Sequence, residues 1–334
     1  MMLCKFGLKT RSILVLVMAF PMQSALAQEP ASSYPSKPIR FISSGVAGGL
    51  TDVVSRVVAD RMNSSGDLRG QQVLVENKPG AAGIIASVFV AKSPADGYTV
   101  AIADLTQTAI VPALYANPQY QTQRDFVPVS LLGTTPFFLG VSASLGVKSL
   151  AEFNTLVRAQ PGKYSYGSSG TGSVHHLATE TLKTRLGLNL VHVPYKSSGQ
   201  STPALIAGDI QVLFTAISPV LPHIKAGKVQ LLGVASAVRT PQAPEVPTFA
   251  ELGVKDMQLV PSVAALVPAG TPPAIVARLA AELRKAVLHP EAVKRFEGLG
   301  IDPVGSTPEQ YAVQLAADIA TFSQAVKLSG AKVE

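Results

Sequence analysis

The stretch IRFISSGVAGGLTDVVSRVVADRM, residues 39–62, decides the fold class, because a strand, a glycine loop and a helix follow one another in it. Three of the first four residues, Ile39, Phe41 and Ile42, are apolar, which is typical of a strand. From Leu50 to Met62, apolar side chains recur at steps of three and four residues, which places them on one face of a helix. This order indicates an α/β fold with a mostly parallel sheet covered by helices.

The same alternation continues along the chain. It predicts further strands at 72–76, 98–103, 164–166, 191–193 and 210–214, helices at 81–91, 150–159, 199–207 and 273–288, and a last helix beginning at 307–309. Turn or start signals precede the helices that begin at 81, 273 and 307–309, namely Pro79-Gly80, Thr271-Pro272-Pro273 and Thr307-Pro308-Glu309.

Two long extended stretches divide the chain. Residues 126–144 predict a crossover strand into a second α/β unit, and residues 229–235 predict the return. The chain of 334 residues is longer than one simple core needs. We therefore expect two lobes, one formed by 28–133 with 238–334 and the other by 134–237.

A second glycine- and serine-rich segment, GSSGTGS at residues 167–173, also follows a strand-like run and opens a helix. Backbone N–H groups at a helix start lack partners and lie at the positive end of the helix dipole. Glycine would also be needed in a plain turn. Ligands of open α/β sheets nevertheless bind beyond the carboxyl ends of strands, where both loops lie. Two matched loops therefore favour a cleft that grips a carboxylate between two lobes.

The candidate ligand-binding residues lie in the two loops, in the helices that follow them and at strand ends. They are Ser44, Gly48, Gly49, Thr51, Asp52, Asp104, Thr106, Ser169, Gly170, Thr171, Gly172, Ser173, His176, Thr215 and Ser218. Asp52 can stabilise its helix start, hold the loop or meet a ligand amino group. Asp104 can cap the segment after it or attract a donor group of the ligand. His176 can brace the loop, face the ligand or pack in the core; its neighbour His175 points about 100° away on a helix.

The N-terminus predicts the compartment. Lys5, Lys9 and Arg11 precede an apolar core at 13–20, and a small-x-small site ends at Ala27. This pattern is typical of a secretory signal peptide, cleaved after Ala27, and predicts a periplasmic protein. A membrane anchor is the alternative, but the apolar run is far shorter than the roughly 20 residues that span a bilayer.

Composition excludes several classes of function. The leader holds three of the 28 basic residues and none of the 21 acidic ones, so its removal lowers the formal net charge from +7 to +4. Such a charge without basic clusters argues against a nucleic-acid partner. The only cysteine, Cys4, lies in the leader, which leaves no disulfide or thiol chemistry. The histidines lack metal-ligand spacing, so we expect neither a metal nor a cofactor.

Enzyme motifs are incomplete. Thr171 stands where a Gly-x-Ser-x-Gly elbow needs its last glycine, and no dinucleotide fingerprint or P-loop lysine is present. A secreted hydrolase that uses Ser169 or Ser173 with His176 stays as an alternative. We expect a non-enzymatic protein.

Seven segments in order resemble the periplasmic solute receptors of tripartite tricarboxylate transporters, the Bug family. They are YPSKPIR (34–40), GGLTD (48–52), VENKPGAAG (75–83), DGYT (96–99), SGTGS with HL (169–173, 176–177), VPYK (193–196) and PTFAELG (247–253). The resemblance implies a type II periplasmic binding fold: two α/β lobes, two crossover strands and a ligand cleft between the lobes. It also implies a carboxylate held by backbone and hydroxyl groups, partly through ordered waters, at 44–51 and 169–173.

Two departures from the family pattern bear on the ligand. Ala47 replaces a usual proline after Ser43-Ser44, and Thr215, Ala216 and Ser218 stand where many members carry an acidic residue. Family-typical citrate, aspartate or glutamate preferences therefore do not transfer. The sequence predicts a monomeric receptor that closes on a small organic carboxylate or amino acid and presents it to membrane permease subunits. A sensory receptor that docks on a membrane histidine kinase is the alternative.

Overall fold

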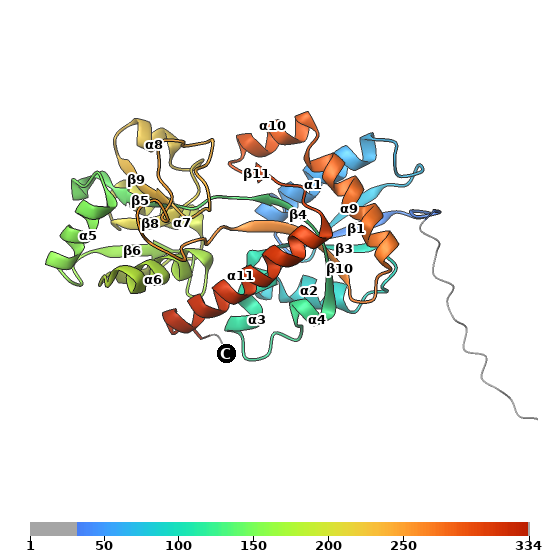
Figure 1. The fold of residues 1–334 in the computed structure, drawn as a ribbon, viewed down its shortest axis with the longest axis horizontal. Helices are drawn as coiled ribbons and strands as arrows, with labels where there is room; N and C mark the ends of the chain where they lie inside the picture. Colours follow the sequence, from blue (N-terminus) through green and yellow to red (C-terminus); the bar gives the residue numbers. More distant parts are fainter. Residues whose placement is uncertain (1–31, 333–334) are drawn as a thin grey trace, which may run out of the picture.

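The structure is a computed structural model that describes residues 32–332. Two α/β lobes lie side by side, each around its own sheet (Figure 1). This arrangement confirms the predicted fold class. The predicted leader and its cleavage site after Ala27 lie outside the described residues. Between residues 32 and 332, no helix combines the length and the hydropathy needed to cross a membrane.

The first lobe has a six-stranded sheet with the order β11-β4-β10-β3-β1-β2. Its strands are β1 (Ile39–Ser43), β2 (Val73–Asn77), β3 (Thr99–Asp104), β4 (Phe126–Thr134), β10 (Ser262–Pro268) and β11 (Asp302–Pro303). One face is covered by α1 (Leu50–Ser64), α9 (Pro273–Val287) and α10 (Pro290–Gly298). The other face is covered by η1 (Ala81–Gly83) with α2 (Ile84–Ala91), the π-helix η2 (Thr106–Ile110) with α3 (Val111–Leu114), the short α4 (Thr122–Asp125) and part of α11 (Pro308–Ser329).

The second lobe has a five-stranded sheet with the order β7-β6-β8-β5-β9. Its strands are β5 (Phe138–Ser142), β6 (Ser165–Ser168), β7 (Val191–Pro194), β8 (Val212–Thr215) and β9 (Val229–Val234). One face packs against α5 (Leu150–Ala159) and α6 (Val174–Leu186), and the other against α7 (Ser198–Ala207) and α8 (Leu221–Lys225). The short η3 (Ala143–Leu145) follows β5.

Both sheets are mixed, which corrects the expectation of mostly parallel sheets. β1 pairs in parallel with β2 and β3, and β6 with β7 and β8. β10 is antiparallel to β3 and β4, and β5 is antiparallel to β8 and β9. The reason is the connection between the lobes: β4 leaves the first sheet and β10 enters it, so the two strands run in opposite directions.

The chain crosses between the lobes twice. Residues 135–137 join β4 to β5, as predicted. The return differs from the expectation, because β9 belongs to the five-stranded sheet and the chain re-enters the first sheet only at Ser262. Before that, Phe249 packs on Phe214 of β8, with ring centroids 5.8 Å apart. The division of the chain at residues 134 and 238 stays a prediction.

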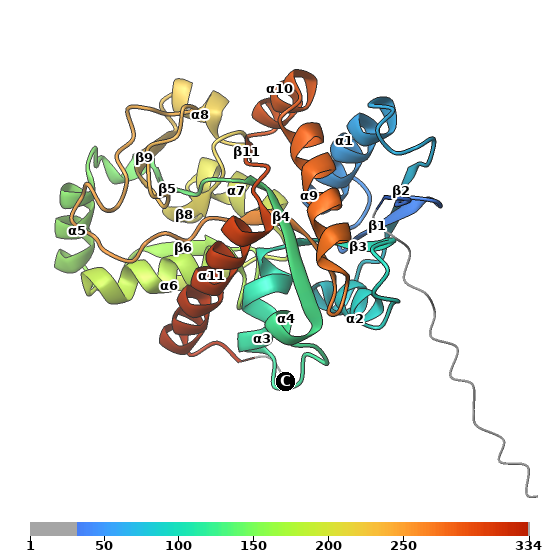
Figure 2. The same ribbon diagram turned by 45° about the vertical axis from the view of Figure 1, so that its right-hand side comes forward.

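Helix α11 makes a third link between the lobes (Figure 2). Its side chains Tyr311 and Leu315 belong to the core of the first lobe. Further along, Phe322 and Val326 join the apolar cluster around α6 of the second lobe, against which α11 packs. Both lobes therefore share one helix as well as two crossovers.

Candidate ligand-binding site

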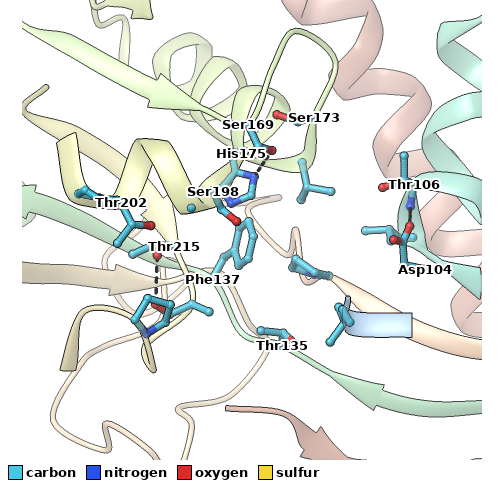
Figure 3. Close-up of a pocket in the computed structure, with 18 of the residues that line it drawn as sticks. Asp104, Thr106, Thr135, Phe137, Ser169, Ser173, His175, Ser198, Thr202 and Thr215 are labelled. Atoms are coloured by element: carbon cyan, nitrogen blue, oxygen red, sulfur yellow. Dashed lines mark hydrogen bonds between the residues drawn. The ribbon is translucent and has the colours of Figure 1, made fainter. Parts of the chain in front are cut away.

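A cavity of about 610 Å³ lies between the lobes. Five of the predicted residues line it: Asp104 and Thr106 from the first lobe, and Ser169, Ser173 and Thr215 from the second. Figure 3 shows the Asp104–Thr106 pair on one side of the cavity and the second-lobe hydroxyls across from it. These residues lie at strand ends and at a helix start, and they come from both lobes. The fold brings them together around the same cavity.

The first glycine loop is held from within by Thr51. Its Oγ1 atom accepts hydrogen bonds from Ser43 Oγ at 3.0 Å and from the Gly45 N–H at 2.9 Å. The Thr51 side chain is buried, and a Cβ at Gly45 would lie 2.6 Å from its Oγ1. The hydroxyl thus shapes the loop, and only glycine leaves room for it at position 45.

Asp52 holds the same loop through its carboxylate. It accepts hydrogen bonds from the Gly48 N–H at 2.8 Å, Asn77 Nδ2 at 2.9 Å and Arg56 Nε at 3.0 Å. Burial alone would raise the pKa of Asp52, but these three donors outweigh burial and hold the pKa below its ordinary value. The residue is 2% exposed, so of the three roles considered for it, the observed contacts are those of a loop brace.

Gln107 is a connecting residue that the sequence did not reveal. Its Oε1 atom accepts from Ser44 Oγ at 2.9 Å and from the Asp104 N–H at 2.7 Å. Its Nε2 donates to the Ala82 carbonyl at 3.2 Å, and a Cβ at Gly83 would lie 2.3 Å from its side chain. One buried amide therefore ties the first loop, the end of β3 and the turn before α2 together.

Asp104 caps the segment after it and also lines the cavity, while its contact with a ligand donor group stays a prediction. Its Oδ1 atom accepts from the Thr106 N–H at 2.7 Å, which caps the segment that follows β3. The residue also lines the cavity. Burial raises the pKa of Asp104 despite its hydrogen bonds to the start of η2. Asp104 therefore lines the cavity in a place where burial disfavours its charged form.

Three histidines support the second glycine loop. His175 Nδ1 lies 2.9 Å from Ser169 Oγ, and His192 Nε2 lies 2.7 Å from Ser168 Oγ. His176 Nδ1 accepts from the Gly172 N–H at 3.2 Å and stacks on His192 with ring centroids 4.3 Å apart. The observed contacts of His176 are therefore those of a brace beneath the loop.

His175 lines the cavity instead of His176. Its ring packs against Phe137 with centroids 4.7 Å apart. Burial lowers the pKa of His175 to about 4, so the ring is neutral at physiological pH. The turn of about 100° per helical residue explains why neighbouring histidines face different surroundings.

The other predicted residues do not line this cavity. Ser44, Thr51, Asp52 and His176 form the contacts described above. Gly48, Gly49, Gly170, Thr171 and Gly172 lie in the two loops, and Ser218 lies against Gly300, where a Cβ would meet its Oγ at 2.2 Å. Contact of these residues with a ligand stays a prediction.

The start of α7 is a part of the site that sequence reasoning missed. Ser198, Gly199 and Thr202 line the cavity there, and His223 of α8 lines it too. The run Ser197-Ser198-Gly199 after a strand repeats the serine–glycine signal of the other two loops, so the same criterion could have found it. Within residues 32–332, no cluster of three or more histidine, aspartate or glutamate side chains is arranged to hold a metal ion.

Two α/β lobes with a cavity lined from both define the class of two-lobed binding proteins. The sequence model of the tripartite tricarboxylate transporter family receptor matches residues 54–328, and the chain belongs to this family. The chain is 33% identical to protein BugT of Bordetella pertussis over 326 residues, which cover 97% of this chain and 99% of BugT.

Solved structures agree with this family and fold. Rpa4515 of R. palustris, solved with adipate, is 30% identical with a TM-score of 0.75 and matches 90% of this chain and 100% of its own. MatC (Rpa3494) from Rhodopseudomonas palustris, solved with bound malate, is 28% identical with a TM-score of 0.71. The match covers 88% of this chain and 100% of the MatC chain.

Proposed function

We propose that this protein is an exported, non-enzymatic receptor that binds a small organic carboxylate between its lobes and delivers it to the permease subunits of a tripartite tricarboxylate-type transporter. The observation that carries the proposal is the cavity between the lobes, which receives the start of α6 and the start of α7 from one side and Asp104 with Thr106 from the other. The acids named with Rpa4515 and MatC support a carboxylate as the ligand.

Hydroxyl and N–H donors suit this task. Four hydroxyl groups of the lining can donate hydrogen bonds to a carboxylate without a charged partner: Ser169, Ser173, Ser198 and Thr202. The dipoles of α6 and α7 favour a negative charge at the N-terminal ends of these helices. A ligand that touches both lobes favours the closed state by its differential affinity for that state. The permease would then recognise the closed form.

Thermal unfolding of the protein after unfolding and refolding, to strip any bound ligand, tests the proposal. A carboxylate at 100 times its dissociation constant stabilises the fold by about 2.7 kcal/mol. We expect such a shift with at least one of a panel of mono-, di- and tricarboxylates, and its loss when Ser169 and Ser173 are both changed to alanine. A panel in which amines or esters stabilise the protein but no carboxylate does would refute the proposal.

A further inference from the structure

The cavity holds one kind of fixed charge. Among the described residues that line it, none is lysine or arginine, and Asp104 is the only carboxyl group. His175, with its lowered pKa, is neutral. A ligand with two or three carboxylates would bring negative charges beside Asp104 with no cation to compensate them, which is costly in a poorly solvated space.

Donors for a single carboxylate gather on the second-lobe side. Ser173 is the N-cap of the 13-residue α6, and Ser169 lies in the loop before it. Ser198 and Thr202 lie within the first turns of the 10-residue α7. Figure 3 shows Ser169, Ser198 and Thr202 on the same side of the cavity. One carboxylate therefore finds its hydrogen bonds there, away from Asp104.

Apolar side chains form part of the cavity wall. Phe137 lies in the middle of the view, tilted at 45° to the His175 ring (Figure 3). The apolar side chains of Val174, Ile206 and Pro261 also line the cavity, and Thr135 adds a hydroxyl group. Ligand hydroxyl groups that lie against these apolar side chains would lose hydrogen bonds to water without replacement. A carbon skeleton at the same place gains free energy from burial.

We infer that the preferred ligand is a monocarboxylic acid with an apolar body and a hydrogen-bond donor, a hydroxyl or an amine, at the end that faces Asp104. The carboxylate binds the second-lobe hydroxyls, the body packs on Phe137, and the donor meets the Asp104 carboxyl group. This inference rests on the proposed function and narrows its ligand class. It departs from the dicarboxylates named with Rpa4515 and MatC.

Two matched series of acids test the inference by isothermal titration calorimetry. One consists of hexanoate, 6-hydroxyhexanoate and adipate, the other of phenylacetate, 4-hydroxyphenylacetate and 1,4-phenylenediacetate. In at least one series we expect the hydroxy acid to bind at least tenfold more tightly than the dicarboxylate and several-fold more tightly than the plain acid. If a dicarboxylate binds most tightly in both series, the inference is wrong and the proposed function stands; if no carboxylate binds, both fail.

The variant Asp104→Asn separates a ligand contact from a structural role. Removal of the negative charge should increase the affinity for the dicarboxylate about tenfold and decrease the affinity for the hydroxy acid several-fold. A structural defect would decrease the affinity for both acids. Asp302→Asn is the matched control, because Asp302 lines a different cavity and not the proposed ligand cavity. Its Oδ1 atom accepts a hydrogen bond from Gln242 Nε2 at 2.9 Å. The control variant should change neither affinity. Equal changes for both acids in Asp104→Asn would overturn the assignment of Asp104.

Discussion

Asp52 and Asp104 are two poorly solvated carboxyl groups whose surroundings shift their pKa values in opposite directions. Asp52 has three donors within 3.0 Å and a lowered pKa. Asp104 faces the cavity and has a raised pKa because burial dominates. The first carboxylate stabilises the fold, and the second costs stability when it is ionised, as is common for groups kept for binding.

Asp52→Asn should destabilise the protein by about 1–3 kcal/mol at pH 7, because charge-assisted hydrogen bonds to the loop are lost. The folded-state pKa of Asp52 is lowered, so its contribution is present above the ordinary aspartate pKa of about 3.9 and is lost as pH falls through the folded value. Urea unfolding at pH 7 and pH 3 measures this. Asp60→Asn is the control, because the Asp60–Arg295 pair is exposed and should contribute little; equal effects of both variants would contradict the prediction.

Asp104→Asn should raise the stability of the ligand-free protein at pH 7. The folded-state pKa is raised, so the stability of the wild-type protein is full below about pH 3.9 and falls as pH rises through the folded value. The advantage of the variant should therefore be present at pH 7 and vanish near pH 3.5. Thermal unfolding without ligand at both values decides this, and a variant less stable than wild type at pH 7 would contradict it.

Single residues were predictable where a backbone signal marks them. Asp104 follows a strand and Ser173 opens a helix, and both line the cavity. Gln107 carries no such signal, because its role depends on three segments that meet only in the folded chain. Phe137 was part of a stretch predicted as extended, but its place in the cavity wall follows from how the crossover enters the second sheet.

At the scale of elements, prediction succeeded where local interactions define the ends. Ser149 Oγ accepts from the Glu152 N–H at 3.2 Å, and α5 spans the predicted residues 150–159. Thr307 and Gln310 form a capping box at the predicted start of α11. β10 was missed because all residues of its run SVAALVP are buried. Without an alternation of apolar and polar residues, the sequence cannot distinguish a strand from a helix.

The second glycine loop should depend on His176 as an acceptor. His176→Leu leaves the Gly172 N–H without its partner, which should cost about 1–3 kcal/mol and weaken ligand binding. His176→Asn places an amide oxygen near the position of Nδ1 and should restore most of both. Urea unfolding and the hydrogen-exchange rate of the Gly172 amide measure the effect; a leucine variant with unchanged exchange at Gly172 would show that the bond is unimportant.

At the scale of the whole molecule, the two crossovers separate two cavities. Thr135 and Pro261 face the ligand cavity, and Thr134, Pro136 and Ser262 line a second cavity of about 250 Å³ on the other side. Alternating side chains of extended segments point to opposite sides, which produces this arrangement. A hinge motion about these segments must also accommodate α11, which packs on both lobes. The sequence predicted the first crossover but placed the return at residues 229–235, which form β9. It did not predict the third link, because α11 bridges cores that are distant along the chain.

The shared apolar cluster predicts how the protein unfolds. Two-lobed chains of this size often unfold in separate steps. Here Phe322, fully buried in α11, packs in the same cluster as Ile110 of the first lobe and Leu182 of the second. The wild-type protein should therefore show one calorimetric transition, with calorimetric and van't Hoff enthalpies that agree.

Phe322→Ala should remove this coupling. The substitution should cost about 3–5 kcal/mol, the range for a buried phenylalanine, and should split or broaden the transition, because each lobe keeps its own sheet and remaining core. Val313→Ala on the same helix is the control, since Val313 is 73% exposed and should leave the transition unchanged. Differential scanning calorimetry distinguishes the outcomes. A wild-type protein with two transitions would mean that the lobes unfold independently. A Phe322→Ala variant with one sharp transition at lower temperature would mean that contacts other than those of Phe322 couple the lobes.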